Sequence, residues 1–392
     1  MDGGPAQGAL VMTRSAMPTE RLSRRFLVLS ASMGSGHDTV AAELMTRLRI
    51  AGHEADCADV LDLLPAGLGT GLRASYRVVI GHLPALYAGV YAAFFRDGAG
   101  PLPNSAPLAV LAGNRLLDLV DRESCDVVVS VFHLAAQITG RLRARGRLRV
   151  PSAVVMTEFT AHRQWLHPGN DLYVCHAEEI AAGIRRTLGR PAVGSGPLVA
   201  SRFCGPPPSG TALWQHRFSA DGRPPVLLSS GAWGIGSGMA DTARLLDAAG
   251  YLPVVLCGEN RRLHRALSVL PRVIALDWVD DLSGLMGACR ALVDNAAGQT
   301  SLEALAAGLP VIGYRPIPGH GVDGVRRMAD LGLSDFARTP RELLSSLHML
   351  AASGSARERR IADGRALVTA VGINPLVTLG IRGHDLAKGA AG

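Results

Sequence analysis

A histidine at position 37 stands between a glycine-rich turn and a helix, where its ring could act as a general base. The turn covers residues 31–36, follows the apolar run 26–30 and precedes a helix predicted over 38–50. The positive end of a helix disfavours imidazolium, so it lowers the pKa of such a histidine and keeps the ring able to accept a proton. A histidine that only caps the helix explains these residues equally well.

A second stretch, residues 294–310, has the same order of strand, small-residue turn and helix. The first N–H groups of a helix lack internal partners and its dipole favours negative charge, so this turn predicts an anion and ribose site. Glu303 is expected in the first turn of the helix, pointing toward whatever the turn binds. The structural alternative is an ordinary strand-to-helix corner, with Thr300 or Ser301 as N-cap and Glu303 as partner of the helix dipole.

Both stretches belong to a series of buried strands and helices that predicts α/β domains with doubly wound parallel sheets. A chain of 392 residues suits two such domains. Loops at the carboxyl ends of parallel strands share one edge, so the glycine loop 231–238, the stretch 294–310 and residues 316–323 should converge on one cleft. The expected strands are 26–30, 126–132, 153–156, 171–175, 226–230, 253–257, 273–276, 291–293 and 311–314.

The proline-rich and glycine-rich segment 205–210 is the strongest linker signal in the chain. The expected division is a disordered leader at 1–22, an N-terminal domain at 23–200, a linker at 201–225, a C-terminal domain at 226–365 and a segment at 366–392. That last segment could pack back on the N-terminal domain before becoming disordered.

Composition excludes several classes of protein. The net charge is +7 and almost every basic residue is arginine, which suits phosphate groups, but the charges are dispersed and no nucleic-acid recognition motif is present. The six cysteines show no metal-ligand spacing and are expected to be buried reduced thiols in a cytosolic protein. No stretch is apolar enough to span a bilayer, and residues 1–22 lack the pattern of a signal peptide.

Residues 66–97 carry apolar and aromatic side chains at helical spacing, with arginines among them. Pro84 divides the segment into two predicted helices, and three of the six tyrosines lie within it. An amphipathic aromatic hairpin with arginines can lie at a membrane interface. A helix pair packed into a core explains the same pattern.

Taken together, these motifs resemble the GT-B glycosyltransferases of family 28, and within it monogalactosyldiacylglycerol synthase and processive diacylglycerol glucosyltransferase. The resemblance covers about residues 26–332. It implies a GT-B fold, in which two Rossmann-like domains face a central cleft. Gln299 stands where that family has a glycine, and Glu158 where it has an aspartate. The segments that carry the resemblance are 32–37, 156–165, 171–174, 194–197, 256–260, 277–286, 298–303 and 318–320.

The resemblance also implies a role for each matching residue. His37 would activate the acceptor, with Glu158 and His162 as rivals or orienters. The acceptor would further meet Gly34, Ser35, Gly36, Thr157, Trp165, Tyr87 and Tyr91. The UDP-sugar donor would meet Gly231, Ala232, Trp233, Gly234, Gly258, Asn260, Val279, Gly298, Gln299, Thr300, Glu303, His320 and Asp323.

The implied activity is inverting transfer of a hexose from a UDP-sugar to the hydroxyl of a diacylglycerol-like lipid, at the inner face of the cell membrane. No cofactor and no metal are expected, in agreement with the absence of a DxD motif from the sequence. The expected partners are the UDP-sugar, the lipid and an anionic membrane surface, and not nucleic acid. Two alternatives remain: a soluble natural product as acceptor, and a degenerate member that binds nucleotide or lipid without transferring sugar.

Overall fold

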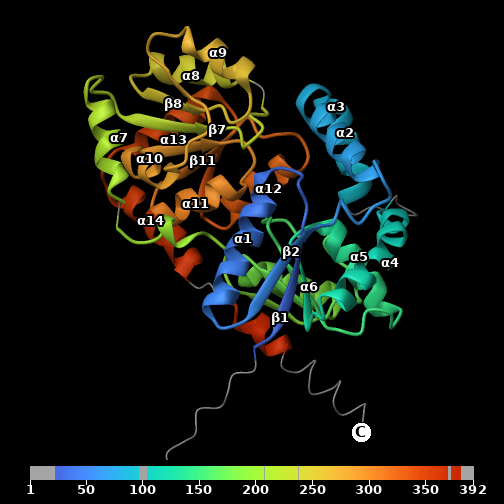
Figure 1. Cartoon of the computed structure of the whole chain (residues 1–392). Helices are drawn as coiled ribbons and strands as arrows, with labels where there is room; N and C mark the ends of the chain where they lie inside the picture. The colour runs from blue at the N-terminus through green and yellow to red at the C-terminus, as the bar shows by residue number, and fades with distance from the viewer. Residues whose placement is uncertain (1–22, 97–103, 207, 237, 370–371, 381–392) are drawn as a thin grey trace, which may run out of the picture.

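The computed structural model describes residues 23–96, 104–206, 208–236, 238–369 and 372–380, so the leader expected at 1–22 lies outside the described residues. Figure 1 shows two halves, each built around a sheet covered by helices. Every strand pair in both sheets is parallel. The expected fold class, two doubly wound α/β domains, is confirmed.

The N-terminal sheet has the strand order β2-β1-β3-β4-β5-β6. Its central strands are buried on both faces, which explains their continuous apolar runs. The elements of this half are β1 (Arg25–Ser30), α1 (Ser35–Ile50), β2 (Glu54–Asp59), α2 (Leu68–His82), α3 (Pro84–Phe95), α4 (Ala106–Arg122), β3 (Val127–Ser130), α5 (His133–Ala144), β4 (Ser152–Val155), β5 (Leu172–Cys175), α6 (Glu178–Leu188) and β6 (Ala192–Gly194).

The C-terminal sheet has the order β12-β11-β10-β7-β8-β9, so β10, the strand before residues 295–310, lies in its interior. The elements here are β7 (Pro225–Ser229), α8 (Met239–Ala248), β8 (Leu252–Leu256), α9 (Arg261–Ser268), β9 (Ile274–Leu276), α10 (Leu282–Ala288), β10 (Ala291–Asp294), α11 (Gln299–Ala307), β11 (Val311–Tyr314), α12 (His320–Asp330), β12 (Ser334–Ala337), α13 (Pro340–Ala351) and α14 (Ser355–Thr369).

The segments between the domains differ from the sequence-based division. Residues 201–225, expected to be a linker, contain the 3₁₀ turn η1 (Ser201–Phe203) and the helix α7 (Gly210–Ser219). Helix α7 packs against α10 through the buried Thr211 and Phe218, so it is part of the C-terminal domain. After α14 the chain returns to the N-terminal domain, where Leu376 is buried beside Phe26 and Val28. Figure 1 shows this last segment below β1.

Helices α2 and α3 form a hairpin that stands beside the C-terminal domain in Figure 1. Its inner side packs Ile80, Tyr87 and Tyr91 against Ile317 of the second domain. The hairpin therefore buries one face between the domains. The hairpin also leaves large apolar side chains exposed, namely Val78, Leu83, Leu86 and Val90.

Candidate active site

Two cavities meet in the cleft between the domains. The larger, of about 710 Å³, is lined mainly by apolar and aromatic residues of α2, α3 and α4 and by the loops after β3 and β4. The smaller, of about 190 Å³, lies between the turn before α1 and the glycine loop after β7. Gly36, Gln299 and His320 line both cavities, so the two spaces adjoin at these residues. A long apolar space beside a glycine-lined one suits two different substrates.

His37 is the third residue of α1 and lines the larger cavity. Its Nδ1 lies 3.0 Å from the carbonyl oxygen of Val131 and 3.1 Å from Oγ1 of Thr157. A carbonyl oxygen can only accept a hydrogen bond, so Nδ1 carries the proton and Nε2 keeps its lone pair. Burial lowers the pKa of His37, which keeps the ring neutral. These are the properties that a general base needs.

Glu158 and His162 lie after β4, with His162 Nε2 3.5 Å from Glu158 Oε2. Burial alone would raise the pKa of Glu158, but the neighbouring His162, His320 and His133 lower it to about 2. The carboxylate is therefore ionised near neutral pH. Its charge also favours the protonated form of His37, so it can stabilise an imidazolium that forms there.

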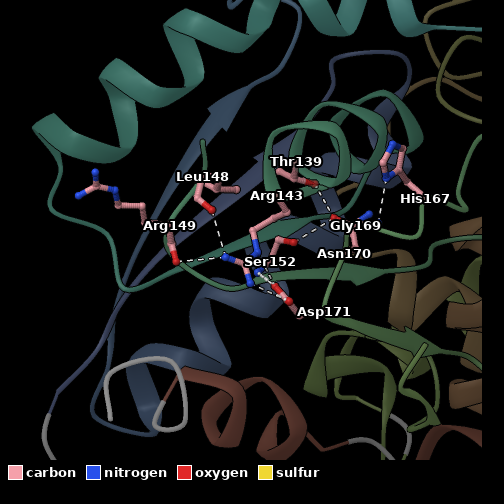
Figure 2. A network of polar contacts seen from close by, with 9 residues as sticks. All are labelled: Thr139, Arg143, Leu148, Arg149, Ser152, His167, Gly169, Asn170 and Asp171. Carbon is pink, nitrogen blue, oxygen red and sulfur yellow. Dashed lines mark hydrogen bonds and ion pairs between the residues drawn. The ribbon is translucent and has the colours of Figure 1, made fainter. Parts of the chain in front are cut away.

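A buried polar network holds the segment between β4 and β5 that carries these groups (Figure 2). Asn170 has no exposed surface and accepts hydrogen bonds from Thr139 at 2.9 Å and Ser152 at 3.0 Å. Asp171 next to it accepts two bonds of 2.8 Å from Arg143. Because the buried polar groups of this network satisfy one another, the end of the segment is fixed in position.

On the other side of the cleft, contacts between two loops set the shape of the glycine loop. Gly234 has φ of 61°, and a Cβ there would lie 2.3 Å from the carbonyl oxygen of Cys257. Asn260 donates to the Gly234 carbonyl at 2.9 Å and accepts from the Leu263 N–H at 2.9 Å, which caps α9. Asn260 and Gly258 therefore hold the glycine loop in its shape. Neither residue lines either cavity.

The N-terminus of α11 lies opposite that of α1. A Cβ on Gly36 would be 3.7 Å from Cβ of Gln299, the first residue of α11. The N-cap is Gly298 and no side chain caps the helix, so capping by Thr300 or Ser301 is wrong. Two facing helix N-termini direct unpaired N–H groups and positive dipole ends at the smaller cavity, which favours an anion there.

Glu303 is the fifth residue of α11, so its expected place in the first turn is wrong. Its side chain is buried, and burial raises its pKa to about 7 against the opposing effects of Arg202 and Gln299. The Gln299 amide also donates to the Leu198 carbonyl at 3.1 Å. Gln299 thus joins α11 to the crossing between the domains, which explains how a longer side chain is accommodated at a position where the resembled family has glycine.

The α2–α3 hairpin contacts the second domain through a cation–π contact, ion pairs and a hydrogen bond. Trp233 of the glycine loop lies beneath the Arg77 guanidinium, which is 5.3 Å from the centre of its ring. The hairpin therefore forms a wall of the larger cavity and also contacts the glycine loop that lines the smaller one. Three further pairs join them: Arg77 to Glu259 at 2.8 Å, Arg96 to Asp323 at 2.8 Å and Tyr87 to His320 at 2.7 Å.

The structure brings most of the sequence-predicted site residues to the two cavities. The larger one is lined by Gly36, His37, Tyr87, Tyr91, Thr157, Glu158, His162, Gly298, Gln299 and His320. The smaller one adds Gly34, Ser35, Gly231, Ala232, Trp233 and Thr300. The remainder lie outside both linings: Trp165, Gly234, Gly258, Asn260, Val279, Glu303 and Asp323. Trp165 has no exposed surface, so it supports the cavity wall from behind.

Some cavity residues do not follow from the motifs. His133 begins α5 at the end of β3, and Tyr76 and Phe95 face the cavity from the hairpin. The position of His133 after a buried strand was a usable signal, because ligands bind at the carboxyl ends of parallel strands. Tyr76 and Phe95 gave only helical spacing, which does not distinguish a cavity wall from a core.

Comparison with known proteins agrees with this geometry. Residues 37–188 match the family described as monogalactosyldiacylglycerol (MGDG) synthase. The chain is 25% identical over 243 residues to the processive diacylglycerol beta-glucosyltransferase of Staphylococcus carnosus, which covers 59% of this chain and 60% of that protein. It is 23% identical over 340 residues to the protein of the same name from Bacillus pumilus, covering 83% of this chain and 86% of that one. The chain thus spans less than two thirds of the first relative and most of the second.

Solved structures show the same fold. The calicheamicin glycosyltransferase CalG4 superposes with a TM-score of 0.60 at 16% identity, over 93% of this chain and 99% of that one. A glycosyltransferase from Siraitia grosvenorii in complex with UDP gives 0.60 at 12% identity, over 91% and 99%. Fold and cleft define the class: the chain has the GT-B architecture of glycosyltransferases. Within it, the chain is related to the MGDG synthase family and is a distant homologue of the processive diacylglycerol glucosyltransferases.

Among the helices in the described parts of the chain, none is long and apolar enough to cross a membrane. Within those same ranges, no group of three histidine, cysteine or acidic side chains could hold a metal ion.

Proposed function

We propose that the protein is an inverting glycosyltransferase that moves a hexose from a UDP-sugar to a hydroxyl of a diacylglycerol-like lipid at the cytoplasmic membrane surface. The observation that carries this proposal is the junction of the two cavities, where an apolar space adjoins a glycine-lined one next to His37. A lipid hydroxyl and a sugar diphosphate would meet there. Relatives named as diacylglycerol glucosyltransferases support the choice of substrates.

In the proposed reaction the acceptor hydroxyl gives its proton to Nε2 of His37 while its oxygen attacks the anomeric carbon of the sugar. The bond from that carbon to the diphosphate breaks, and UDP leaves with the electron pair. Nδ1 of His37 keeps its proton throughout and donates a hydrogen bond to the Val131 carbonyl. Glu158 stabilises the imidazolium that forms. General-base catalysis of this kind contributes roughly 10²–10⁴-fold to the rate.

The donor would lie against the second domain. Its diphosphate carries the charge that develops as UDP leaves, and the N-terminus of α11 with the glycine loop around Gly231 offers backbone N–H groups for it. We assign the uracil to the backbone of Val279 and the ribose hydroxyls to Glu303, as the family resemblance implies. A protein of the same fold, the transferase from Siraitia grosvenorii, is solved in complex with UDP, which supports UDP as the nucleotide of the donor.

The acceptor would enter the larger cavity between the hairpin and α4. Its lining of leucine, valine and aromatic side chains suits acyl chains, and Glu158 with its histidines provides the polar end for a head group. Apolar side chains are also exposed on the hairpin at Val78 and Leu86. An exposed apolar face on a protein with net charge +7 suits an anionic membrane surface.

The test is release of UDP from a panel of UDP-hexoses, with and without vesicles containing diacylglycerol. We expect release that depends on the vesicles with at least one UDP-hexose. Release that needs a soluble acceptor instead would favour the natural-product alternative. Binding of a UDP-hexose without any release, across both acceptor classes, would identify a degenerate binding protein and contradict the proposal.

A further inference from the structure

Tyr87 and His320 form a hydrogen bond across the cleft that the reaction described above does not use. The Tyr87 hydroxyl on α3 lies 2.7 Å from Nδ1 of His320, the first residue of α12. Tyr87 is buried and belongs to the wall of the larger cavity, while His320 lines both cavities. The Tyr87 ring also meets Tyr76 edge-on, and Tyr76 meets Trp233 of the glycine loop in the same way.

The direction of this hydrogen bond follows from the chemistry of the two groups. A neutral imidazole has one nitrogen that donates and one that accepts. The phenol O–H is a more acidic donor than the imidazole N–H, and the unprotonated imidazole nitrogen is a stronger acceptor than the phenol oxygen. Tyr87 therefore donates to Nδ1 of His320. Burial lowers the pKa of His320, so the ring is neutral and its single proton lies on Nε2.

We propose that Tyr87 is a positioning residue that fixes the tautomer of His320, so that the Nε2–H of His320 donates to a hydroxyl of the hexose in the bound UDP-sugar. This inference rests on the proposed function and adds to it a link between the two substrate sites. Within the described residues, no hydrogen bond occupies Nε2, and the ring lies where the glycine-lined and apolar cavities adjoin. A wall residue of the acceptor cavity thereby orients a donor ligand.

The tautomer can be observed without any catalysis. In protein labelled with ¹⁵N-histidine, the His320 resonances are assigned by their loss in His320→Gln. We expect a pyridine-type shift for Nδ1 in the wild-type protein, and an average of both tautomers in Tyr87→Phe. Tyr251→Phe is the control, because Tyr251 lies immediately before β8 and outside both cavity linings. A pyrrole-type Nδ1 in the wild type, or an unchanged tautomer in Tyr87→Phe, would overturn the assignment.

The effect on donor binding is measured as two dissociation constants. One is the Kd of the UDP-hexose that the wild type turns over, UDP-glucose or UDP-galactose, and the other is the Kd of UDP. We expect Tyr87→Phe to weaken binding of the UDP-hexose about tenfold, equivalent to ~1.4 kcal/mol, and to leave the Kd of UDP unchanged. The Tyr251→Phe control should change neither Kd. In the His320→Gln background, Tyr87→Phe should have no further effect, because a glutamine amide offers N–H donors whatever Tyr87 does.

The outcomes separate this inference from the proposed function. Suppose that the wild type binds UDP-hexose, and that Tyr87→Phe either weakens the binding of UDP and UDP-hexose equally or weakens the binding of neither. In both cases the inference is wrong while the proposed function stands. Additive losses in the double variant would also contradict the inference. If the wild type neither binds nor turns over any UDP-hexose, the proposed function fails and the donor role of His320 fails with it, although the tautomer measurement still decides the Tyr87 contact.

Discussion

Catalytic roles in this cleft depend on which nitrogen of each imidazole carries the proton. At His37 the Val131 carbonyl accepts from Nδ1 at 3.0 Å, which leaves Nε2 as the basic atom on the cavity side. Under the proposed mechanism, replacing the ring removes the base and leaves unchanged the loops of the second domain that are proposed to bind the donor. Binding and turnover should therefore respond differently to changes at this residue.

We expect His37→Ala to lower kcat by roughly 10²–10⁴-fold and to leave the affinity for UDP unchanged. Steady-state kinetics with the best UDP-hexose, alongside calorimetry with UDP, measures both quantities. His82→Ala is the control, since His82 is exposed at the end of α2, outside both cavity linings. Turnover that stays at the wild-type level in His37→Ala would remove the residue from the mechanism.

The pKa of Glu303 makes a second prediction, which concerns pH. Burial raises this pKa to about 7, so the carboxyl is largely protonated at pH 6 and ionised at pH 8. If ribose hydroxyls donate to the carboxylate, UDP binding should strengthen as the pH rises through about 7. In Glu303→Gln that part of the pH dependence should be absent, and UDP should bind more weakly at pH 8. Calorimetric titrations of UDP across this range provide the measurement, and identical pH profiles for both proteins would contradict the ribose assignment.

The same residue has an opposite effect on folding. Its folded pKa of about 7 lies above the value of an exposed glutamate, so its contribution to stability is fully present below the unfolded pKa. That contribution is lost as the pH rises toward and through about 7. The unliganded protein should therefore lose stability over a pH range in which UDP binding gains strength. This is expected when a buried carboxylate lacks hydrogen-bond donors until a ligand supplies them.

At the scale of elements, the strands in the interior of the sheets could be predicted, whereas three of the four edge strands, β2, β6 and β12, could not. Strand β11 has the bounds expected from its apolar run, whereas β2 reads Glu-Ala-Asp-Cys-Ala-Asp and has no apolar run to detect. An edge strand is stabilised by pairing on one side only, and its polar side chains also discourage pairing with other molecules. Helix α7 was hidden by the proline-rich segment before it, because its packing on α10 is a tertiary contact.

The same distinction between local sequence patterns and tertiary contacts applies to the candidate site. Residues next to a glycine turn, such as His37 and Gly298, were found because the turn itself predicts a site. The buried network around Asn170 was not, since its residues come from α5, β4 and the loop before β5, and only the fold brings them together. The Tyr87–His320 contact joins residues 233 positions apart and could not be read from local spacing either.

The network around Asn170 supports a prediction about stability. Asn170→Ala leaves the hydroxyls of Thr139 and Ser152 without their shared acceptor inside the domain, so it should lower the free energy of unfolding by about 2–4 kcal/mol. Asn114→Ala is the matched control: Asn114 is exposed and accepts a single bond from Arg147, so its loss should cost less than about 0.5 kcal/mol. Urea titrations give both values, and equal midpoints for the two variants would contradict a structural role for the network.

At the scale of the whole molecule, the exposed apolar side chains are not all equivalent. Val78 lies on α2 and Leu86 on α3, whereas Leu213 lies on α7, which Figure 1 shows on the other side of the C-terminal domain from the hairpin. All three are more than half exposed, at 53%, 53% and 75%. Because α2 and α3 also line the larger cavity, the proposed function predicts that the hairpin pair, and not Leu213, enters the membrane.

We expect the double variant Val78→Gln and Leu86→Gln to bind vesicles containing phosphatidylglycerol at least tenfold more weakly than the wild type. Each apolar side chain that no longer enters the bilayer forfeits about 1.5 kcal/mol or more, and every ~1.4 kcal/mol is a factor of ten. Leu213→Gln should bind as the wild type does, and sedimentation of the vesicles measures all three. Raising the salt concentration should weaken binding of every protein, because the arginine charges are screened. If the double variant sediments with vesicles as the wild type does, the hairpin is not the membrane-facing surface, and the acceptor must reach the cavity from another direction.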